Sequence, residues 1–267
     1  MSEPLRYELL RPQQILAERA RLPLAYVPIG PLEWHGPHLP LGTDMLHAHT
    51  MALEAARETG GVVLPPFPIG TETVTDPERL RHRGFTGNER VVGMDYPGFD
   101  PPSLYIEESA MGVVLREVLQ ALKRQQFRVI VIVNGHGAPN HRAALLRIAD
   151  EQTQPGQVVV LVTGYLYDTN YREHAALGET SYVMAFHPET VGLGALPPLP
   201  EPLRYTAYGI LDLPTIVGEP SEGFAVAQAY DPRAATPEKG RSHVAAEARS
   251  IAKKARDALA SVGIAVR

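Results

Sequence analysis

Three short, almost wholly apolar segments constrain the fold of this chain more than any other feature. They are residues 24–29, 128–133 and 157–163, and stretches with helical spacing of apolar residues lie between and after them. Runs of this kind are typical of strands that are covered on both faces in a parallel sheet. The alternation predicts an α/β fold, a three-layer α/β/α sandwich with a mostly parallel central sheet. We expect a single domain spanning residues 1–267.

The predicted helices are marked by apolar spacing and by residues that start or stop a helix. We expect one helix to begin at Asp44 as its N-cap and to run to Gly60. In the last predicted helix, Thr236 would be the N-cap and Pro237 the first helical residue. Residues 66–103 are rich in Gly, Pro, Thr and Asp and carry little periodicity. So long a segment inside a compact domain is usually functional, as a lid or as an interface arm.

The composition limits the compartment and the partners. Of the 267 residues 44% are hydrophobic and 21% charged, the formal net charge is −5, and no block of lysine and arginine favours nucleic acid. Cysteine is absent, so any metal must be held by His, Asp and Glu. The first ten residues lack the pattern of a signal peptide, and no run of 18 apolar residues occurs. We expect a cytoplasmic protein that acts on a small molecule, without nucleic acid or membrane as partner.

Two loops that follow predicted strands carry groups able to bind metal. The segment PLEWHGPHLPLGTD contains Glu33, His35 and Asp44, and the segment NGHGAPN contains His136. Ligands in α/β folds gather beyond the carboxyl ends of the strands, so the two loops should meet there. Carboxylate and imidazole groups suit a divalent metal of the zinc or manganese kind.

The spacing within the first loop favours a pair of metal ions. Alternate residues of an extended loop point in opposite directions, so Glu33 and His35 could serve different ions. Asp44 has two carboxylate oxygens and is the natural bridge between two ions, as two-metal hydrolytic sites require.

The remaining histidines have a simpler interpretation, because a lone loop histidine is more often a hydrogen-bonded structural residue than a ligand. We interpret in this way His38, His47, His49, His82, His141, His187 and His243. Trp34 is interpreted as a packing residue, and Asn134 as a helix cap or as a residue that holds the shape of its loop.

At these motifs the chain resembles the creatininase family. The matching segments are PLEWHGPHLPLGTD at 31–44, NGHGAPN at 134–140, REHAALGETS at 172–181 and DPRAATPEKG at 231–240, so the resemblance covers almost the whole chain. It implies an α/β sandwich fold, a homo-oligomer that is often a hexamer, and two divalent metal ions per chain, of zinc, manganese or iron.

The resemblance also implies roles for individual residues. The metal ligands would be Glu33, His35, Asp44 and His136. The Glu173–His174 pair precedes the E-T-S element, and there His174 would be a proton shuttle.

The chain departs from creatininase proper at two points. Ala138 stands where creatininase proper has a glutamate that completes the second metal site, and we predict that Glu179 replaces it as a metal ligand. Creatininase proper also places tryptophans around its ring substrate, whereas the only tryptophan here is Trp34. We therefore do not expect creatinine itself to be the substrate.

These features lead to one functional hypothesis and two alternatives. The hypothesis is a metal-dependent amidohydrolase that hydrolyses a non-peptide C–N bond, in a cyclic amide or a formamide, with a water activated between two ions. His174 would protonate the leaving nitrogen, oriented by Glu173. Alternatively, the same metal site could open a sugar lactone or cleave a keto-sugar. The chain could also be a non-catalytic metal-binding accessory protein, which the presence of Ala138 would favour.

Overall fold

A parallel β-sheet forms the centre of the molecule. The computed structural model describes residues 5–164, 174–201, 203, 205–206, 209–210, 217–218 and 230–265. In these residues the main sheet has the strand order β1-β3-β2-β4-β5, and every neighbouring pair of its strands is parallel. The strands are β1 (Leu5–Arg6), β2 (Leu24–Ile29), β3 (Val62–Val63), β4 (Val129–Asn134) and β5 (Val159–Gly164). A separate antiparallel pair is formed by β6 (Tyr205–Thr206) and β7 (Gly209–Ile210).

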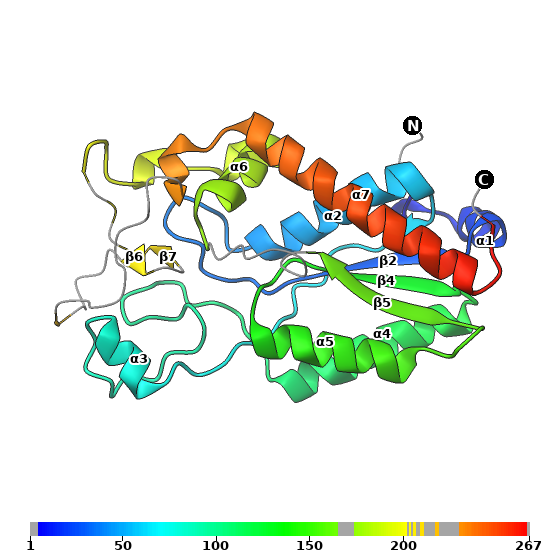
Figure 1. Cartoon of the computed structure of the whole chain (residues 1–267), viewed down its shortest axis with the longest axis horizontal. Helices are drawn as coiled ribbons and strands as arrows, with labels where there is room; N and C mark the ends of the chain where they lie inside the picture. The colour runs from blue at the N-terminus through cyan, green and yellow to red at the C-terminus, as the bar shows by residue number, and fades with distance from the viewer. Residues whose placement is uncertain are drawn as a thin grey trace.

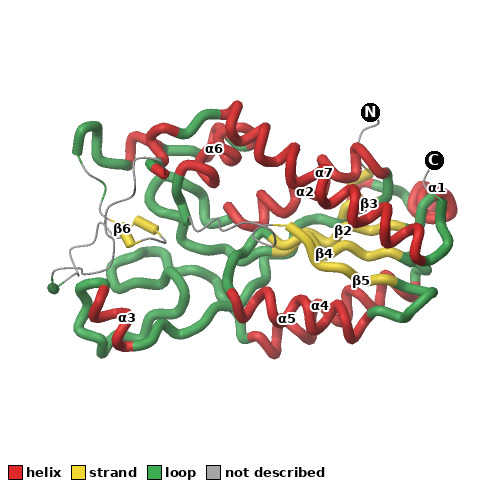
Figure 2. The backbone as a smooth tube through the Cα atoms, in the orientation of Figure 1, coloured by secondary structure: helices red, strands yellow, loops and turns green. Residues whose placement is uncertain are grey.

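Helices cover both faces of the sheet (Figures 1 and 2). They are α1 (Pro12–Arg21), α2 (Thr43–Thr59), α3 (Pro77–His82), α4 (Glu108–Arg124), α5 (Pro139–Gln152), α6 (Leu177–Phe186) and α7 (Pro237–Ser261). Helices α2 and α7 pack against one face, and α4 and α5 pack against the other. The predicted α/β sandwich is therefore confirmed.

The two apolar cores follow from the alternation of side chains along β2 and β4. Tyr26 and Val131 point toward α2 and α7, while Val27 and Ile132 point toward α4 and α5. On α2 and α7 the facing residues are mostly alanines, which let these two helices lie close together. For the large apolar side chains of the strands, such as Val131 and Ile132, full burial contributes about 1.5–3 kcal/mol each relative to exposure to water.

The start of α2 differs from its prediction. Gly42, not Asp44, is the N-cap, and Asp44 lies in the first helical turn with only 3% of its surface exposed. The carboxylate of Asp44 is turned toward histidines of the site, so it does not cap the helix. The prediction for α7 is confirmed, because the Thr236 side chain accepts a hydrogen bond from the backbone N–H of Lys239.

Two glycines bring the strand ends and the first turn of α2 into direct contact. Ile29 of β2 is in register with Asn134 of β4, so the loops after both strands leave the same edge of the sheet. A Cβ atom on Gly135 would lie 2.0 Å from the carbonyl oxygen of Asp44, and one on Gly30 would lie 2.8 Å from the Asp44 Cβ. Only glycine at these two positions allows Asp44 to approach both loops.

The long segment between β3 and α4 contains α3 and a small apolar core of its own. The buried members of this core are Leu80, Phe85, Val91, Met94 and Tyr96. The Trp34 ring packs against this core and stacks on Phe99, with 4.4 Å between ring centroids. This contact joins the loop that carries Glu33 and His35 to the segment between β3 and α4. It agrees with the interpretation of Trp34 as a packing residue. Within the described residues, no helix combines the length and the apolar character that a membrane span needs.

Candidate metal centre

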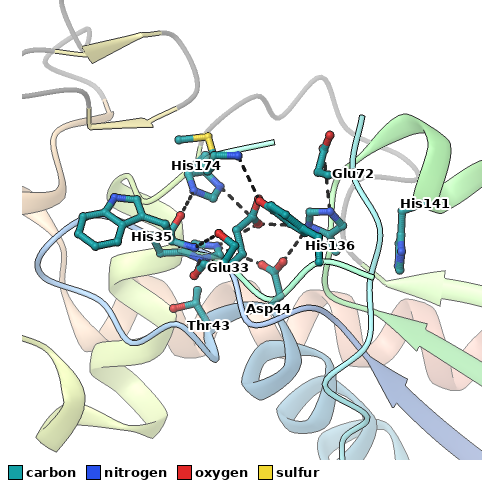
Figure 3. A network of polar contacts seen from close by, with 12 residues as sticks. Glu33, His35, Thr43, Asp44, Glu72, His136, His141 and His174 are labelled. Atoms are coloured by element: carbon teal, nitrogen blue, oxygen red, sulfur yellow. Dashed lines mark hydrogen bonds and ion pairs between the residues drawn. The ribbon is translucent and has the colours of Figure 1, made fainter. Parts of the chain in front are cut away.

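Asp44 lies in the middle of a buried cluster of carboxylates and histidines (Figure 3). Its Oδ1 atom is 3.1 Å from Nε2 of His35, and its Oδ2 atom is 2.8 Å from Nδ1 of His136. The two oxygens of one carboxylate therefore face histidines from two different loops, as the prediction of a bridging aspartate requires.

The first group of possible metal ligands consists of Glu33, Asp44 and His136. The Glu33 Oε2 atom lies 3.2 Å from Nδ1 of His136. The donor atoms of all three residues lie within 4.8 Å of one another, and all three side chains are buried. This spacing is compatible with one cation between them.

The second group consists of His35, Asp44 and Glu179. The Nδ1 atom of His35 is 3.0 Å from the carbonyl oxygen of Glu33 and donates to it, so Nε2 is the nitrogen that faces the carboxylates. Glu179 Oε2 lies 3.7 Å from this Nε2 atom and accepts a hydrogen bond from the Ala175 N–H. The donor atoms of the group lie within 4.8 Å of one another. Glu179, from α6, thus lies close to His35 and Asp44, and its role as a substitute ligand stays a prediction.

His174 lies beside both groups. Its Nε2 atom donates a hydrogen bond of 2.6 Å to the carbonyl oxygen of Trp34, and its Nδ1 atom is 3.9 Å from Oε2 of Glu33. The rings of His174 and His35 have centroids 4.2 Å apart. Glu33, His35 and His174 form a third group whose donor atoms lie within 4.8 Å. Glu173, the predicted partner of His174, lies outside the described residues.

The loop that carries His136 is held by Asn134. The Asn134 side chain accepts a hydrogen bond from the backbone N–H of His136 and donates one to its carbonyl oxygen. Its Oδ1 atom also accepts from Nε2 of His141, at 3.1 Å. Asn134 therefore holds the shape of the loop, which was one of its two interpretations. His141 contributes by donating a hydrogen bond to the Asn134 side chain.

The electrostatics of the cluster are those of a cation site. Burial opposes the charged form of His35, but the carboxylates of Asp44, Glu179 and Glu33 outweigh it and raise the pKa of His35 to about 10. Burial also opposes the charged form of His136, but the carboxylates of Glu33 and Asp44 outweigh it and raise the pKa of His136 well above its usual value. Burial alone would raise the pKa of Glu33, yet His136, His174 and His35 hold it well below normal.

The donor set fits divalent metal ions. The cluster offers carboxylate oxygens and imidazole nitrogens, the ligands that zinc, manganese and iron accept. The buried Nε2 atom of His35 has no hydrogen-bond partner among the described residues, although it faces two carboxylates. A metal ion would satisfy this atom, and His35 and His136 would then bind in their neutral forms.

Other histidines lie outside the two ligand groups. Nε2 of His38 lies 3.0 Å from the Thr180 hydroxyl, and burial lowers the pKa of His38 to about 4. His47, on α2, is buried and stacks on the Tyr182 ring. These contacts agree with structural roles for both residues.

Two residues at the cluster, Tyr105 and Glu72, were not expected from the sequence. The Tyr105 hydroxyl donates a hydrogen bond of 2.5 Å to Oε1 of Glu33. The Glu72 Oε1 atom lies 4.0 Å from Nε2 of His136. Both residues come from the segment between β3 and α4, and neither belongs to a motif or follows a predicted strand, so no local signal distinguishes them.

The comparisons with known proteins assign the family. The family model named Creatininase, described as creatinine amidohydrolase, matches residues 8–255. This chain belongs to the creatininase family. The fold and the metal-motif loops described above are thus those of a creatininase-family member.

Two curated relatives share part of the sequence. The chain is 29% identical to the mycofactocin precursor peptide peptidase of Mycolicibacterium smegmatis over 178 residues, which are 64% of this chain and 60% of that protein. It is 24% identical to the creatinine amidohydrolase of Pseudomonas putida over 187 residues, 62% of this chain and 65% of that protein. The chain therefore spans less than two thirds of either relative in these matches.

Solved structures of the family share the fold at low sequence identity. A manganese creatininase has a TM-score of 0.68 and 19% identity, covering 96% of this chain and 98% of that one. A putative creatinine amidohydrolase from Bacteroides fragilis has a TM-score of 0.65 and 21% identity, covering 97% of both chains. A Zn–Zn form of a creatininase variant has a TM-score of 0.64, 20% identity, and coverage of 96% and 98%.

The raised pKa of His35 predicts a pH-dependent metal affinity. In the metal-free protein the protonated ring contributes stability that is full below its ordinary pKa of 6.5 and is lost as the pH rises through about 10. A metal ion must displace this proton, so the affinity for Mn²⁺ should rise by up to about tenfold per pH unit between pH 6 and pH 9. Calorimetric titration at several pH values measures this slope. An affinity that does not change with pH would contradict the prediction.

Proposed function

We propose that this chain is a metal-dependent amidohydrolase that hydrolyses a non-peptide C–N bond, in a cyclic amide or a formamide. The observation that carries the proposal is the position of Asp44, whose two oxygens face two separate histidines. In the proposal, one zinc, manganese or iron ion is bound by Glu33, Asp44 and His136, and a second by His35, Asp44 and Glu179. Such a pair of ions, when bound, lowers the pKa of a water molecule and polarises a carbonyl group.

The relatives support hydrolysis of a C–N bond in general. One is named an amidohydrolase of creatinine, and the other a peptidase that acts on a precursor peptide. Manganese and zinc occur in solved structures of creatininase. Because one relative acts on a peptide, a peptide bond is the second candidate substrate. The lactone or keto-sugar reaction and the accessory protein have no comparable support from the relatives.

His174 is the proposed proton shuttle. Its Nε2–H is donated to the carbonyl oxygen of Trp34, so in the neutral ring the Nδ1 atom is the acceptor and faces Glu33. An acceptor held on this side can take a proton from the attacking water and deliver it to the leaving nitrogen. The Trp34 carbonyl keeps the ring in this orientation during both transfers.

Orientation of His174 by Glu173 stays a prediction, as do the homo-oligomer, the single domain and the cytoplasmic location.

Glu179→Gln tests the second ion. Glutamine keeps the size of the side chain and its acceptor for the Ala175 N–H but loses the charge, so we expect about one metal ion per chain instead of two. Elemental analysis of protein prepared without chelators measures the ratio. The matched control is Glu54→Gln, a half-buried glutamate of the same charge on α2 that pairs with Arg57, and it should keep both ions. Two tightly held ions in Glu179→Gln would remove Glu179 from the ligand set.

His174→Gln separates a proton shuttle from a metal ligand. We expect unchanged metal content and a kcat lower by about 10²- to 10⁴-fold, the usual contribution of general acid–base catalysis. The control is His82→Gln, which changes an exposed histidine of α3. Loss of one metal ion in His174→Gln would instead place His174 among the ligands. Full activity of this variant would contradict a catalytic role for His174.

A substrate screen tests the class of bond. Metal-loaded wild-type protein is assayed on lactams, formamides, short peptides and sugar lactones, with Asp44→Asn as the background for each. We expect turnover of lactams or formamides that is lost in Asp44→Asn, because this variant removes the bridging charge. Turnover of peptides alone would favour the second candidate, and turnover of lactones alone would favour the sugar reaction. A metal-loaded protein that turns over none of these compounds would contradict the proposal and favour an accessory role.

A further inference from the structure

The segment between β3 and α4 forms a wall of the metal cluster through two backbone contacts. Leu104 pairs with Leu32, and its N–H donates a hydrogen bond of 2.7 Å to the Leu32 carbonyl oxygen. The N–H of Ile106 donates one of 2.9 Å to the carbonyl oxygen of Gly70. Tyr105 is therefore held between Leu104, which pairs with the residue before Glu33, and Ile106, which is bonded to Gly70 within the same segment.

The hydrogen bonds of the Tyr105 hydroxyl determine its direction. The hydroxyl accepts a hydrogen bond of 3.2 Å from the backbone N–H of Met94 and donates its single proton to Oε1 of Glu33. The bond therefore fixes the direction of the Glu33 Oε1 atom.

The second oxygen of Glu33 is the one directed into the cluster. Its Oε2 atom lies 3.2 Å from Nδ1 of His136 and 3.9 Å from both Nε2 of His35 and Nδ1 of His174. With Oε1 hydrogen-bonded to Tyr105, Oε2 is the oxygen that Glu33 turns toward the histidines. Rotation of the carboxylate would break its shortest hydrogen bond.

The close packing around Gly93 shows that little space is left beside this contact. A Cβ atom on Gly93 would lie 2.6 Å from the Tyr105 hydroxyl oxygen and 2.7 Å from Cγ of Glu72. The backbone φ of Gly93 is +54°, a value that glycine adopts readily. Gly93 thus permits the Met94 N–H to reach the hydroxyl, and a larger residue would displace Tyr105.

We propose that Tyr105 is a positioning residue that fixes which oxygen of Glu33 is presented to the metal ion. The inference deepens the proposed function and rests on Glu33 as a metal ligand. The contact that carries this role is the one between the Tyr105 hydroxyl and Glu33. It acts as residues behind metal ligands commonly do, by fixing the orientation of the ligand, and loss of such partners typically weakens metal affinity by 10- to 100-fold.

Tyr105→Phe removes the hydroxyl and keeps the ring. The matched control is Tyr26→Phe, which removes another tyrosine hydroxyl, one that bonds to the Thr59 hydroxyl at 2.7 Å. Thr59 and Asp44 lie at opposite ends of α2, about 22 Å apart at 1.5 Å per residue. Both variants lose a hydrogen-bonded hydroxyl, so a general loss of stability affects both. Only Tyr105→Phe should affect the metal.

The readouts are Zn²⁺ affinity, by competition with a chromophoric chelator, and the visible spectrum of the Co²⁺-loaded protein. We expect Tyr105→Phe to weaken Zn²⁺ binding by about 10- to 100-fold and to change the Co²⁺ spectrum, with Tyr26→Phe like the wild type in both. Gly93→Ala, which displaces Tyr105 without removing a hydroxyl, should change the spectrum in the same direction.

The outcomes separate this inference from the proposed function. If the wild type binds Zn²⁺ and Tyr105→Phe has the same affinity and the same Co²⁺ spectrum, the positioning role is overturned while the metal site stands. If the wild type binds neither Zn²⁺ nor Co²⁺, the proposed function falls, and the positioning role falls with it. An equal loss of affinity in Tyr26→Phe would also overturn the role, since the effect would then be one of general stability.

Discussion

The bridging position of Asp44 is the constraint on which the rest of the site depends. The residue lies in the first turn of α2, against glycines at the ends of β2 and β4, and each of its oxygens faces a different histidine. Concentrating buried carboxylates here is costly unless cations neutralise them. The raised pKa values of His35 and His136 show the same negative potential in the metal-free protein. A pair of divalent ions would replace these protons and relieve the repulsion between the carboxylates.

The parts of the fold and site that depend on local pattern could be predicted from the sequence. The apolar runs that became β2, β4 and β5 are covered on both faces, and the loops after β2 and β4 meet because parallel strands end at one edge. The role of Asp44 at the start of α2 was predicted wrongly, because N-cap and first-turn aspartates have the same sequence signature. In the structure Asp44 faces His35 and His136, and the contact with His136 joins residues 92 positions apart in the sequence.

The parts that depend on long-range contact could not be predicted. Tyr105 and Glu72 reach the cluster because a segment without periodicity pairs with the backbone of Leu32 and carries its own small core. Glu179 was predicted only because Ala138 leaves a ligand missing, and the structure brings its carboxylate to His35 from α6. The segment between β3 and α4 thus contributes Tyr105 and Glu72 to the site within the chain itself. A lid or an interface arm formed by residues 66–103 stays a prediction.

The most direct test of the central claim is an anomalous X-ray diffraction map of crystals grown with Mn²⁺ or Zn²⁺. Two peaks roughly 3.5–4 Å apart, one on each side of the Asp44 carboxylate, are the predicted result. One peak should contact Glu33 and His136, and the other His35 and Glu179. A single peak, or two peaks that do not share Asp44, would contradict the claim that this aspartate bridges a pair of metal ions.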